Sequence, residues 1–450
     1  MPRSTDRHPD RHTDRHTDRQ SVIVDVLEHA FADLMDADPR GFRAKYRKMA
    51  ADPFAFFRGT ACLFYNDVTA DTDEWADERT SAIWIHGDLH VENFGTYMNS
   101  DGRLVFDVND FDEAYIGHFS WDLRRFAASL ALMGWQKALP EGAVRDLIAR
   151  YVRAYLGQVS HYVGSADDDD FGLHLHNTSG PVHDVLVQAR GHTRSGMLDR
   201  MTRIADRVRV FDEDPTVRRL GKRERGQVLQ AFDSYLETIP ESKRFDRELF
   251  YDVRDVVGKS GFGIGSAGLP AYNVLVEGAS QALDNDVVLS MKQANVPSVS
   301  RFLDGDAVER YFEHEGHRTA VSQRALQVHT DPLLGYTRIR GVGYVVSEVS
   351  PYEADLDWSD INEPAEMARV VQDLGRATAK VHCASDEDSD QDLVDFQTEK
   401  AIAGLLEGRR RAFVDAIVSF GIDYAVRARE DHSLFVDAFR ESRIGGVSAT

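Results

Sequence analysis

The sequence contains little cysteine and no long apolar run. Its 450 residues include only two cysteines, Cys62 and Cys383, which cannot form the disulfide framework of a small secreted protein. No run of about 18 apolar residues is present that could span a bilayer, and no positively charged, apolar signal segment opens the chain. We therefore expect a soluble, cytoplasmic protein.

Positive charge is also scarce. Acidic residues outnumber basic ones by 75 to 53, the formal net charge is −22, and only nine of the 53 cations are lysines. Such a surface repels phosphate backbones and anionic lipids. The composition therefore argues against nucleic acid and against a membrane surface as partners. Hydrophobic residues make up 42% of the chain, which is enough for the core of an ordinary globular protein.

Periodicity divides the chain into four segments. Residues 1–20 repeat Asp-Arg-His with almost no apolar side chain, which predicts a disordered tail. Residues 21–250 are mainly helical in pattern, with apolar residues three and four apart and two short β-like runs. Residues 251–350 have the pattern of strands separated by glycine turns, and residues 351–450 return to helix. This order predicts an α+β fold with a small antiparallel sheet.

Polar residues crowd the stretch WIHGDLHVENFG, directly after an apolar run. Asp88 lies at a turn and Asn93 follows five residues later, while the next β-like run leads into Asp107, Asp110 and Asp112. Phosphoryl transfer requires a carboxylate that orients a hydroxyl and takes its proton, with an amide oxygen and a further carboxylate to hold Mg²⁺. Aspartates this close together disfavour ionisation unless a cation is present. A functional site is therefore favoured over a turn whose polar atoms only satisfy one another.

Three short motifs in this region resemble those of a known superfamily. HGDLHVEN, NDFDEA and WDLRR resemble the catalytic and metal-binding segments of aminoglycoside phosphotransferases, choline kinases and their protein-kinase-like relatives. More closely, DPFAFFRG, HGDLHVENFG, VFDVNDFDEA and WDLRRFAASL together are similar to a prokaryotic family known as domain of unknown function 2252. The closer resemblance covers most of the chain after the tail.

The resemblance to the kinase-like enzymes implies roles for individual residues. Asp88 falls on the catalytic aspartate and Asn93 on a metal-binding asparagine. Asp110 is the preferred second metal ligand because it lies twelve residues before Asp122 of WDL; Asp112 is a further candidate and Asp107 the fallback. The candidate supporting residues are His86, His90, Arg58 and Asp122, besides Asp107.

Kinase-like chains place a glycine-rich loop and a lysine-bearing strand before the catalytic segment, whereas here both follow it. GKSGFGIGSAG carries Gly263, Gly265 and Gly268, spaced as in a loop whose N–H groups approach phosphates, and VVLSMKQA places Lys292 near the end of an apolar strand. GYVVSEVSP then resembles the connection between lobes, and DLGRATAKVH the helix before the catalytic loop. We infer a two-lobed kinase-like fold with circularly permuted lobe order, which a chain tolerates where its original ends lie close together.

The resemblance further implies ATP and Mg²⁺ as cofactors and transfer of phosphate to a hydroxyl of a small molecule, which is not identified. Three nearby glutamates are candidates for the partner of Lys292, and the sequence does not determine the oligomeric state. Acidic residues hint at a cationic or polyhydroxylated acceptor, although solvated surface charge explains them at least as well. The residues in question are Glu309, Glu313 and Glu315 for the partner, and Glu92, Asp112, Glu113, Glu353 and Asp355 for the acceptor.

Two other classes of protein fit parts of the pattern. Gly87-Asp88-Leu89-His90 matches the Gly-Asp-x-His element of metallophosphoesterases, which hold two transition metals, but the later Gly-Asn-His segment of those enzymes is absent. A nucleotide-binding pseudokinase or regulatory protein is the second alternative, since fold does not fix function. The joint presence of Asp88, Asn93, Asp110 and Lys292 disfavours it.

Overall fold

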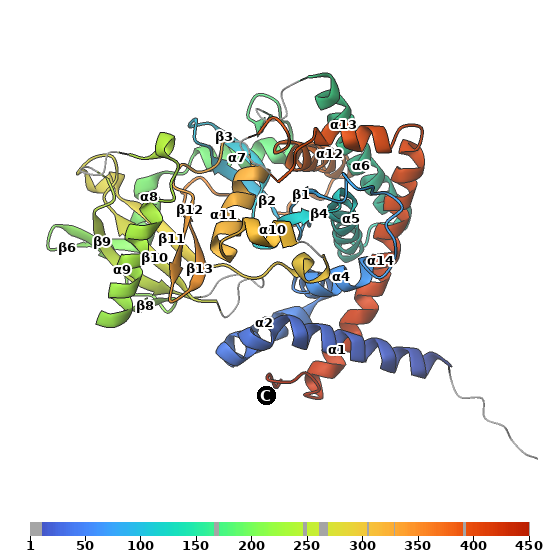
Figure 1. Ribbon diagram of the computed structural model, residues 1–450, viewed down its shortest axis with the longest axis horizontal. Coiled ribbons are helices and arrows are strands. Elements are labelled where there is room, and N and C mark those ends of the chain that lie inside the picture. Colours follow the sequence, from blue (N-terminus) through green and yellow to red (C-terminus); the bar gives the residue numbers. More distant parts are fainter. Residues whose placement is uncertain are drawn as a thin grey trace, which may run out of the picture.

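A computed structural model describes residues 11–165, 171–245, 250–260, 269–303, 306–327, 329–389 and 393–449. The fold consists of helices and antiparallel sheets, which confirms the predicted α+β class. Figure 1 shows the main sheet on one side of the molecule and most of the helices on the other. The predicted glycine loop, with Gly263, Gly265 and Gly268, lies outside the described residues.

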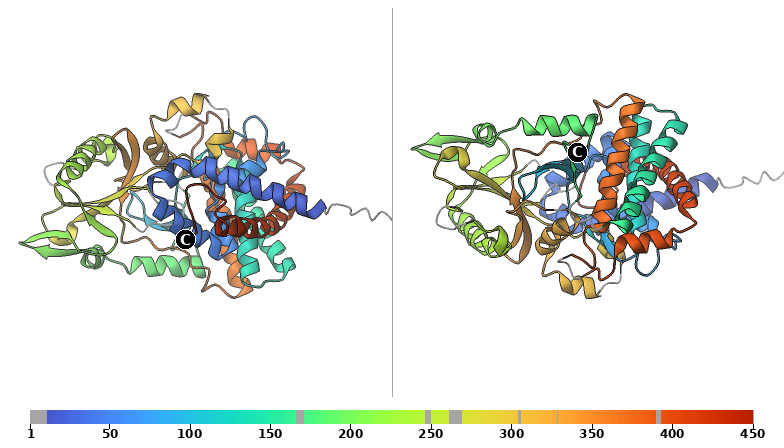
Figure 2. Two further views of the ribbon diagram at one scale, coloured as in Figure 1. Left: turned by 90° about the horizontal axis from the view of Figure 1, so that it is seen from below. Right: turned by 90° about the horizontal axis from the view of Figure 1, so that it is seen from above.

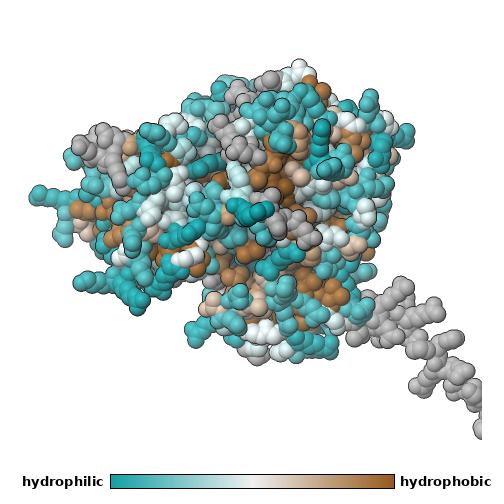
Figure 3. Space-filling model, in the orientation of Figure 1, coloured by the Kyte–Doolittle hydropathy of each residue, from teal (hydrophilic) through white to brown (hydrophobic). Residues whose placement is uncertain are grey.

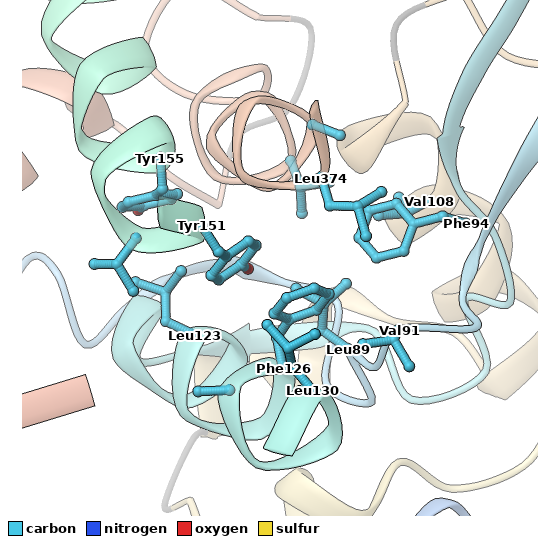
Figure 4. Close-up of a cluster of buried hydrophobic side chains, with 14 of the residues drawn as sticks. Leu89, Val91, Phe94, Val108, Leu123, Phe126, Leu130, Tyr151, Tyr155 and Leu374 are labelled. Carbon is cyan, nitrogen blue, oxygen red and sulfur yellow. The ribbon is translucent and has the colours of Figure 1, made fainter. Parts of the chain in front are cut away.

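Helices from both ends of the chain surround one large hydrophobic core. Helix α6 (Glu141–Gly164) packs on α12 (Pro364–Cys383), and α5 (Phe119–Gln136) packs on α14 (Arg410–Arg440). In Figure 4 the rings of Phe126 from α5 and Tyr151 from α6 lie against each other, with centroids 3.9 Å apart. Apolar residues three and four apart thus form the buried faces of these helices. Helices α3 (Pro53–Arg58), α4 (Ala61–Val68) and α13 (Thr398–Leu405) also contribute to this core, whereas α1 (Arg11–Ala37) and α2 (Pro39–Ala51) pack with the end of α14 around a second, smaller core.

The N-terminal helix begins earlier than the sequence predicted. We expected residues 1–20 to be disordered, but α1 begins at Arg11, and residues 1–10 lie outside the described part of the chain. The reason lies in the next turns of the helix. Arg19 forms ion pairs with Asp67 (2.8 Å) and Asp431 (2.6 Å), and Ile23 is fully buried. These contacts hold α1 against α4 and α14, and Figure 2 shows α1 lying across α14.

The main sheet has six strands in the order β12-β13-β11-β10-β9-β8, with every neighbouring pair antiparallel. The strands are β8 (Val217–Arg219), β9 (Val253–Lys259), β10 (Ala271–Val276), β11 (Val287–Gln293), β12 (Gly335–Ile339) and β13 (Val342–Glu348). Strand β10 is buried along its whole length because both faces of the sheet are covered. Val274 packs in the core under α9 (Lys222–Leu236), whereas the next residue, Leu275, packs with Leu198 of α8 (Arg194–Met201).

This sheet unit extends beyond the predicted segment 251–350. Its core includes Phe232 of α9, and its other face is covered by α8 and Phe211 of the hairpin β6 (Thr202–Ala205) and β7 (Val208–Phe211). The unit therefore begins near residue 194. The helical periodicity of α8 and α9 gave no sign that these helices pack on the sheet rather than in the helical unit.

Short strands position the segment with the crowded polar residues. Strand β1 (Ile83–Ile85) pairs with β4 (Tyr115–Gly117), while β2 (Phe94–Met98) pairs with β3 (Leu104–Val108), which also pairs with β5 (Leu173–His174). Helix α7 (Pro181–Arg190) packs on β2 and β3. The remaining elements are α10 (Asp306–Tyr311), α11 (Glu315–Leu326) and the 3₁₀ turns Glu241–Lys243, Leu283–Asn285 and Ser298–Phe302.

The chain that leaves the sheet after β13 runs along the β2–β3 hairpin before it enters α12. The Thr96 N–H donates to the Ala354 carbonyl oxygen at 2.9 Å, and Gly95 forms a bridge with Asp355. The Trp358 indole N–H donates to the Val91 carbonyl oxygen at 2.7 Å. This connection therefore fixes the sheet unit beside the polar segment.

The face shown in Figure 3 is largely hydrophilic, with hydrophobic side chains visible in smaller areas between the polar ones. Within the described residues, no helix combines the length and the apolar character needed to cross a membrane.

Candidate functional site

The loop that carries Asp88 is held by the buried carboxylate of Asp122, in the first turn of α5. This carboxylate accepts the backbone N–H of His86 at Oδ2 (2.7 Å) and that of Gly87 at Oδ1 (3.0 Å). Gly87 has a φ of +81°, and an added Cβ would lie 2.1 Å from a backbone carbonyl oxygen, so the turn requires glycine. Although burial raises its pKa, hydrogen bonds from His382 and from the loop hold the pKa of Asp122 below its ordinary value. Asp122 is therefore charged and fixes the loop.

Asp88 itself is paired with Arg125. The Nε–H of Arg125 donates to Asp88 Oδ1 at 2.6 Å, and its Nη2–H donates to the Phe57 carbonyl oxygen at 3.1 Å. The fully buried guanidinium also lies over the Phe57 ring, 4.4 Å from its centre. Desolvation raises the pKa of Asp88, and Arg125 opposes that rise. No described residue donates a hydrogen bond to Asp88 Oδ2, so one oxygen can accept a proton from a ligand.

Asp88, Asp110, Asp112 and Glu113 line one small cavity of about 30 Å³. Asp110 has a φ of +59°, which is uncommon for a residue other than glycine. Desolvation and the charge of Asp110 raise the pKa of Asp112 to about 6. Desolvation also raises the pKa of Glu113 to about 7. Carboxylates crowded in this way favour a bound cation.

The donor set of this cavity fits Mg²⁺ better than a pair of transition metals. The described part of the chain contains no group of three or more His, Cys, Asp or Glu side chains placed to hold a metal ion, whereas two-metal hydrolases require such a set. Mg²⁺ needs only one or two carboxylates together with phosphates and water. Asp110 and Asp112 meet this requirement, because neither carboxylate is hydrogen-bonded or ion-paired to another described residue.

Asn93 lies next to the cavity rather than in its wall. It is 3% exposed, and its Nδ2–H donates to the Asp88 carbonyl oxygen at 2.9 Å. The amide therefore braces the loop, and its Oδ1 receives no hydrogen bond within the described residues.

Asp107, the fallback metal ligand, has a structural role. It is buried in β3 and forms an ion pair with Lys380 of α12, which is 1% exposed. The Lys380 ammonium also donates to the Leu326 carbonyl oxygen at 2.7 Å. A buried carboxylate that is neutralised by a buried ammonium cannot also serve as a metal ligand without leaving that ammonium unpaired. The ion pair therefore argues against Asp107 as a metal ligand.

The two histidines of the loop and Arg58 make contacts that orient the backbone. His86 Nε2 lies 2.8 Å from the Asn109 carbonyl oxygen. Burial lowers the pKa of His90 well below its ordinary value, so the ring is neutral. The Glu92 N–H faces Nδ1 and the Arg58 Nε–H faces Nε2, both at 3.3 Å, and the neutral ring accepts one of them at its single unprotonated nitrogen. Arg58 also lines the cavity and pairs with Glu92 through Nη1. None of these contacts requires a histidine to act as a base.

Lys292 lies on β11, in the middle of the sheet between β10 and β13. Its side chain is exposed, and its positive charge opposes the rise in the pKa of Asp112. Lys292 is not among the residues that line the cavity, and its link to the site is this effect of its charge on the Asp112 carboxyl. Of the glutamates considered as its partner, Glu313 lies 3.6 Å from Arg338, and Glu315 pairs with a buried arginine of α11.

That arginine, Arg318, joins the sheet unit to the cavity. It is 1% exposed and donates to the carbonyl oxygens of Ala114 (2.7 Å), Asp112 (2.8 Å) and Asn295 (2.9 Å). Because these carbonyl groups belong to the carboxylate-bearing segment and to the chain after β11, Arg318 fixes one relative to the other.

The sequence patterns did not predict several residues of the site. Arg125 and Arg318 look like ordinary helix arginines, and Lys380 reaches Asp107 across 273 positions. One residue did carry a signal. Lys45 of α2 is 3% exposed and lines the cavity, and it occupies the apolar stripe formed by Phe42 and the buried residues that follow it. Burial lowers the pKa of Lys45 to about 8.

Comparison with known proteins identifies the family of this chain. Residues 37–438 match the family described as "Uncharacterized protein conserved in bacteria (DUF2252)", and the chain belongs to that family. No curated protein and no solved structure matches the chain.

Proposed function

We propose that the chain is an ATP- and Mg²⁺-dependent phosphotransferase that acts on a hydroxyl group of a small molecule. The observation that carries this proposal is the cavity that gathers Asp88, Asp110 and Asp112, together with the charge of Lys292, which acts on Asp112 from the sheet. These four groups include the proton acceptor, the metal-binding carboxylates and the phosphate-binding cation that phosphoryl transfer requires.

Asp88 is the group that orients the acceptor hydroxyl and takes its proton. Arg125 holds Oδ1, which leaves Oδ2 for the hydroxyl, and the raised pKa of the carboxyl makes it a better proton acceptor. Asp122 keeps the loop in one conformation through the N–H groups of His86 and Gly87. Catalysis would come mainly from this positioning.

Asp110 and Asp112 are the carboxylates that would hold Mg²⁺, with Asn93 beside them, and Lys292 would contact the phosphates of ATP. Bound Mg²⁺ supplies neutralisation of the charge on the phosphoryl group. The two carboxylates are suited to this role because neither forms a hydrogen bond or an ion pair with a described side chain, in contrast to Asp107 with its buried lysine.

We further propose that the fold is kinase-like and two-lobed, with circularly permuted lobe order. Three features support this. The antiparallel sheet follows the segment with Asp88 in the sequence, the chain after β13 returns along the β2–β3 hairpin, and α12 then packs against β1 and β3. Helices from both flanks of the sheet complete the helical unit, as a permuted chain requires.

The test is the binding of ATP·Mg²⁺ to the purified chain, measured by calorimetry. Asp110→Ala and Lys292→Ala are each expected to weaken binding at least tenfold. Asp360→Ala and Lys222→Ala are matched controls, since both residues are exposed, and they should bind like the wild type. Asp88→Asn should keep nucleotide binding and lose phosphoryl transfer in a screen of hydroxylated acceptors.

Two results would contradict the proposal. One is a folded wild-type chain that binds no nucleotide in the presence of Mg²⁺. The other is nucleotide binding that neither Asp110→Ala nor Lys292→Ala changes, since the nucleotide would then lie elsewhere. Binding without transfer to any acceptor, and without an effect of Asp88→Asn on ATP turnover, would favour the non-catalytic nucleotide-binding alternative.

A further inference from the structure

A buried lysine from the N-terminal helices lines the same cavity as Asp88. Lys45 of α2 is 3% exposed, and its ammonium lies 4.1 Å from the centre of the Phe31 ring and 5.2 Å from that of Phe42. Among the residues that the structure describes, this ammonium makes no hydrogen bond and no ion pair. The aromatic faces attract the positive charge, but they do not replace the oxygen acceptors that an ammonium has in water.

Of the four carboxylates that line the cavity, Glu113 and Asp88 are engaged by other donors, and neither Asp110 nor Asp112 forms an ion pair with Lys45 within the described residues. Both carboxylate oxygens of Glu113 accept hydrogen bonds from Ser298, one from its N–H and one from its hydroxyl group. Asp88 is bound at Oδ1 by Arg125. A buried ammonium is normally paired. Lys45 is therefore an unusual case, because it is a buried cation without an ion-pair partner among the described residues and it lines the same cavity as Asp88.

Arg58, the other cation in this wall, differs in that respect. Its Nη1 is paired with Glu92, and its Nε lies 3.3 Å from His90 Nε2. Arg58 therefore has protein partners, whereas the hydrogens of the Lys45 ammonium have none within the described residues. Arg58 thus supports the loop, whereas the Lys45 ammonium can donate hydrogen bonds to a ligand.

We propose that Lys45 binds an oxyanion of a substrate in this cavity, either the phosphoryl group in transfer or an acid group on the acceptor. The inference rests on the proposed function for the reaction and adds a specificity-determining residue to it. It also changes the expected acceptor. The acidic residues hinted at a cation, but Lys45 selects for negative charge at the point nearest the α1–α2 helices.

The experiment compares wild type, Lys45→Met, Lys45→Gln and the exposed control Lys48→Met in the full chain. Calorimetry measures the binding of inorganic phosphate in the presence of Mg²⁺, and then of ATP·Mg²⁺ and ADP·Mg²⁺. Wild type and Lys48→Met should bind phosphate alike, and both Lys45 variants at least tenfold more weakly. The glutamine variant keeps the test valid if the methionine variant does not fold.

The nucleotides distinguish the two sources of the oxyanion. If Lys45 contacts the phosphoryl group in transfer, its loss weakens ATP·Mg²⁺ tenfold or more and leaves ADP·Mg²⁺ within about twofold of wild type. If it contacts the acceptor, both nucleotides keep their affinity, and phosphate binding to the ADP·Mg²⁺-saturated protein is lost.

The inference is overturned if wild type binds no phosphate, or if the Lys45 variants bind phosphate and both nucleotides as Lys48→Met does. It can fail independently of the proposed function. A wild type that binds phosphate through Lys45 but no ATP would refute the kinase assignment and retain the oxyanion site.

Discussion

Replacing Lys45 by methionine should stabilise the protein. Burial lowers the pKa of Lys45 from 10.5 to about 8, against the opposing influence of Cys62, Glu113 and Asp88. A shift of that size corresponds to about 3 kcal/mol of preference against the charged form. Methionine has a similar length and suits the apolar surroundings formed by Phe31 and the rest of the α2 stripe. We expect Lys45→Met to raise the free energy of unfolding by about 1–3 kcal/mol at pH 7.

The pH dependence follows from the same shift. The unfolded chain holds the Lys45 proton up to pH 10.5, and the folded chain holds it only up to about pH 8. Between these values the unfolded state binds more protons, so stability rises with pH. Below pH 8 both states are protonated and the full cost of the buried charge is present. The advantage of Lys45→Met over wild type should therefore shrink from pH 8 towards pH 10.5.

Thermal unfolding followed by circular dichroism at pH 7 and pH 9.5 measures both effects. The quantity to compare is the difference in unfolding temperature between wild type and Lys45→Met, because the other titrating groups contribute equally to both proteins. Lys48→Met controls for the loss of a surface lysine. If Lys45→Met unfolds at a lower temperature than wild type at pH 7, the ammonium stabilises the fold. The argument for an unsatisfied cation would then be refuted.

Three further substitutions test the interior of the site by urea unfolding, with Asp146→Ala on the surface as a control that should change stability by less than about 0.5 kcal/mol. Lys380→Met should cost about 3–5 kcal/mol, because it leaves the buried Asp107 carboxylate unpaired; a neutral result would contradict the ion pair. Asp122→Ala should cost about 2–3 kcal/mol, because two backbone N–H groups lose their acceptor, and unchanged stability would mean that water replaces it. For Glu113, whose pKa is raised from 4.5 to about 7, the folded state binds more protons between these values, so this group makes the fold less stable as pH rises. Glu113→Gln should remove that decline between pH 5 and pH 7, and an identical pH profile would count against it.

The elements that the sequence predicted correctly depend on local patterns. Glycine turns and apolar runs marked β9, β10, β11 and β13, and apolar spacing marked α6 and α12. The boundary at residue 251 was misplaced because the packing of α9 on the sheet depends on which apolar face meets which partner, and periodicity carries no such information.

The residues of the candidate site likewise fall into those that local sequence predicts and those that depend on distant partners. Asp88, Asp110 and Asp112 are close in the sequence and line one cavity. The role of Asp107 depends on Lys380, which is far away in the sequence, and no local pattern distinguishes a carboxylate that has such a partner from one that lacks it. Lys45 is the opposite case. A charged residue within an apolar helical stripe is a readable anomaly, because burying it unpaired is costly.

The proposed permutation makes a prediction about chain connectivity that needs no knowledge of the reaction. The last described residues run beside the first helix. Arg443 Nη1 donates to Gln20 Oε1 at 2.6 Å, and the Gly445 N–H donates to Glu28 Oε1 at 2.5 Å. A flexible linker of about twelve residues reaches roughly 40 Å when extended, which is enough to join residue 449 to residue 18. The chain can then be opened at the exposed turn between β6 and β7, at residues 206–207.

The resulting chain begins with all strands of the main sheet, leaves α8 and β6 at its other end, and places the Asp88 segment after the sheet, which is the order of kinase-like chains. Permutation preserves the native contacts if the joined ends are close and the new ends are exposed. We expect a cooperative unfolding transition within a few degrees of wild type and unchanged ATP·Mg²⁺ binding. The same joined chain opened between Thr378 and Ala379, inside the buried part of α12, is the control that should not fold. If opening at residues 206–207 is as damaging as opening inside α12, the sheet unit and the helical unit do not tolerate exchange of their order, and the permutation hypothesis loses its physical basis.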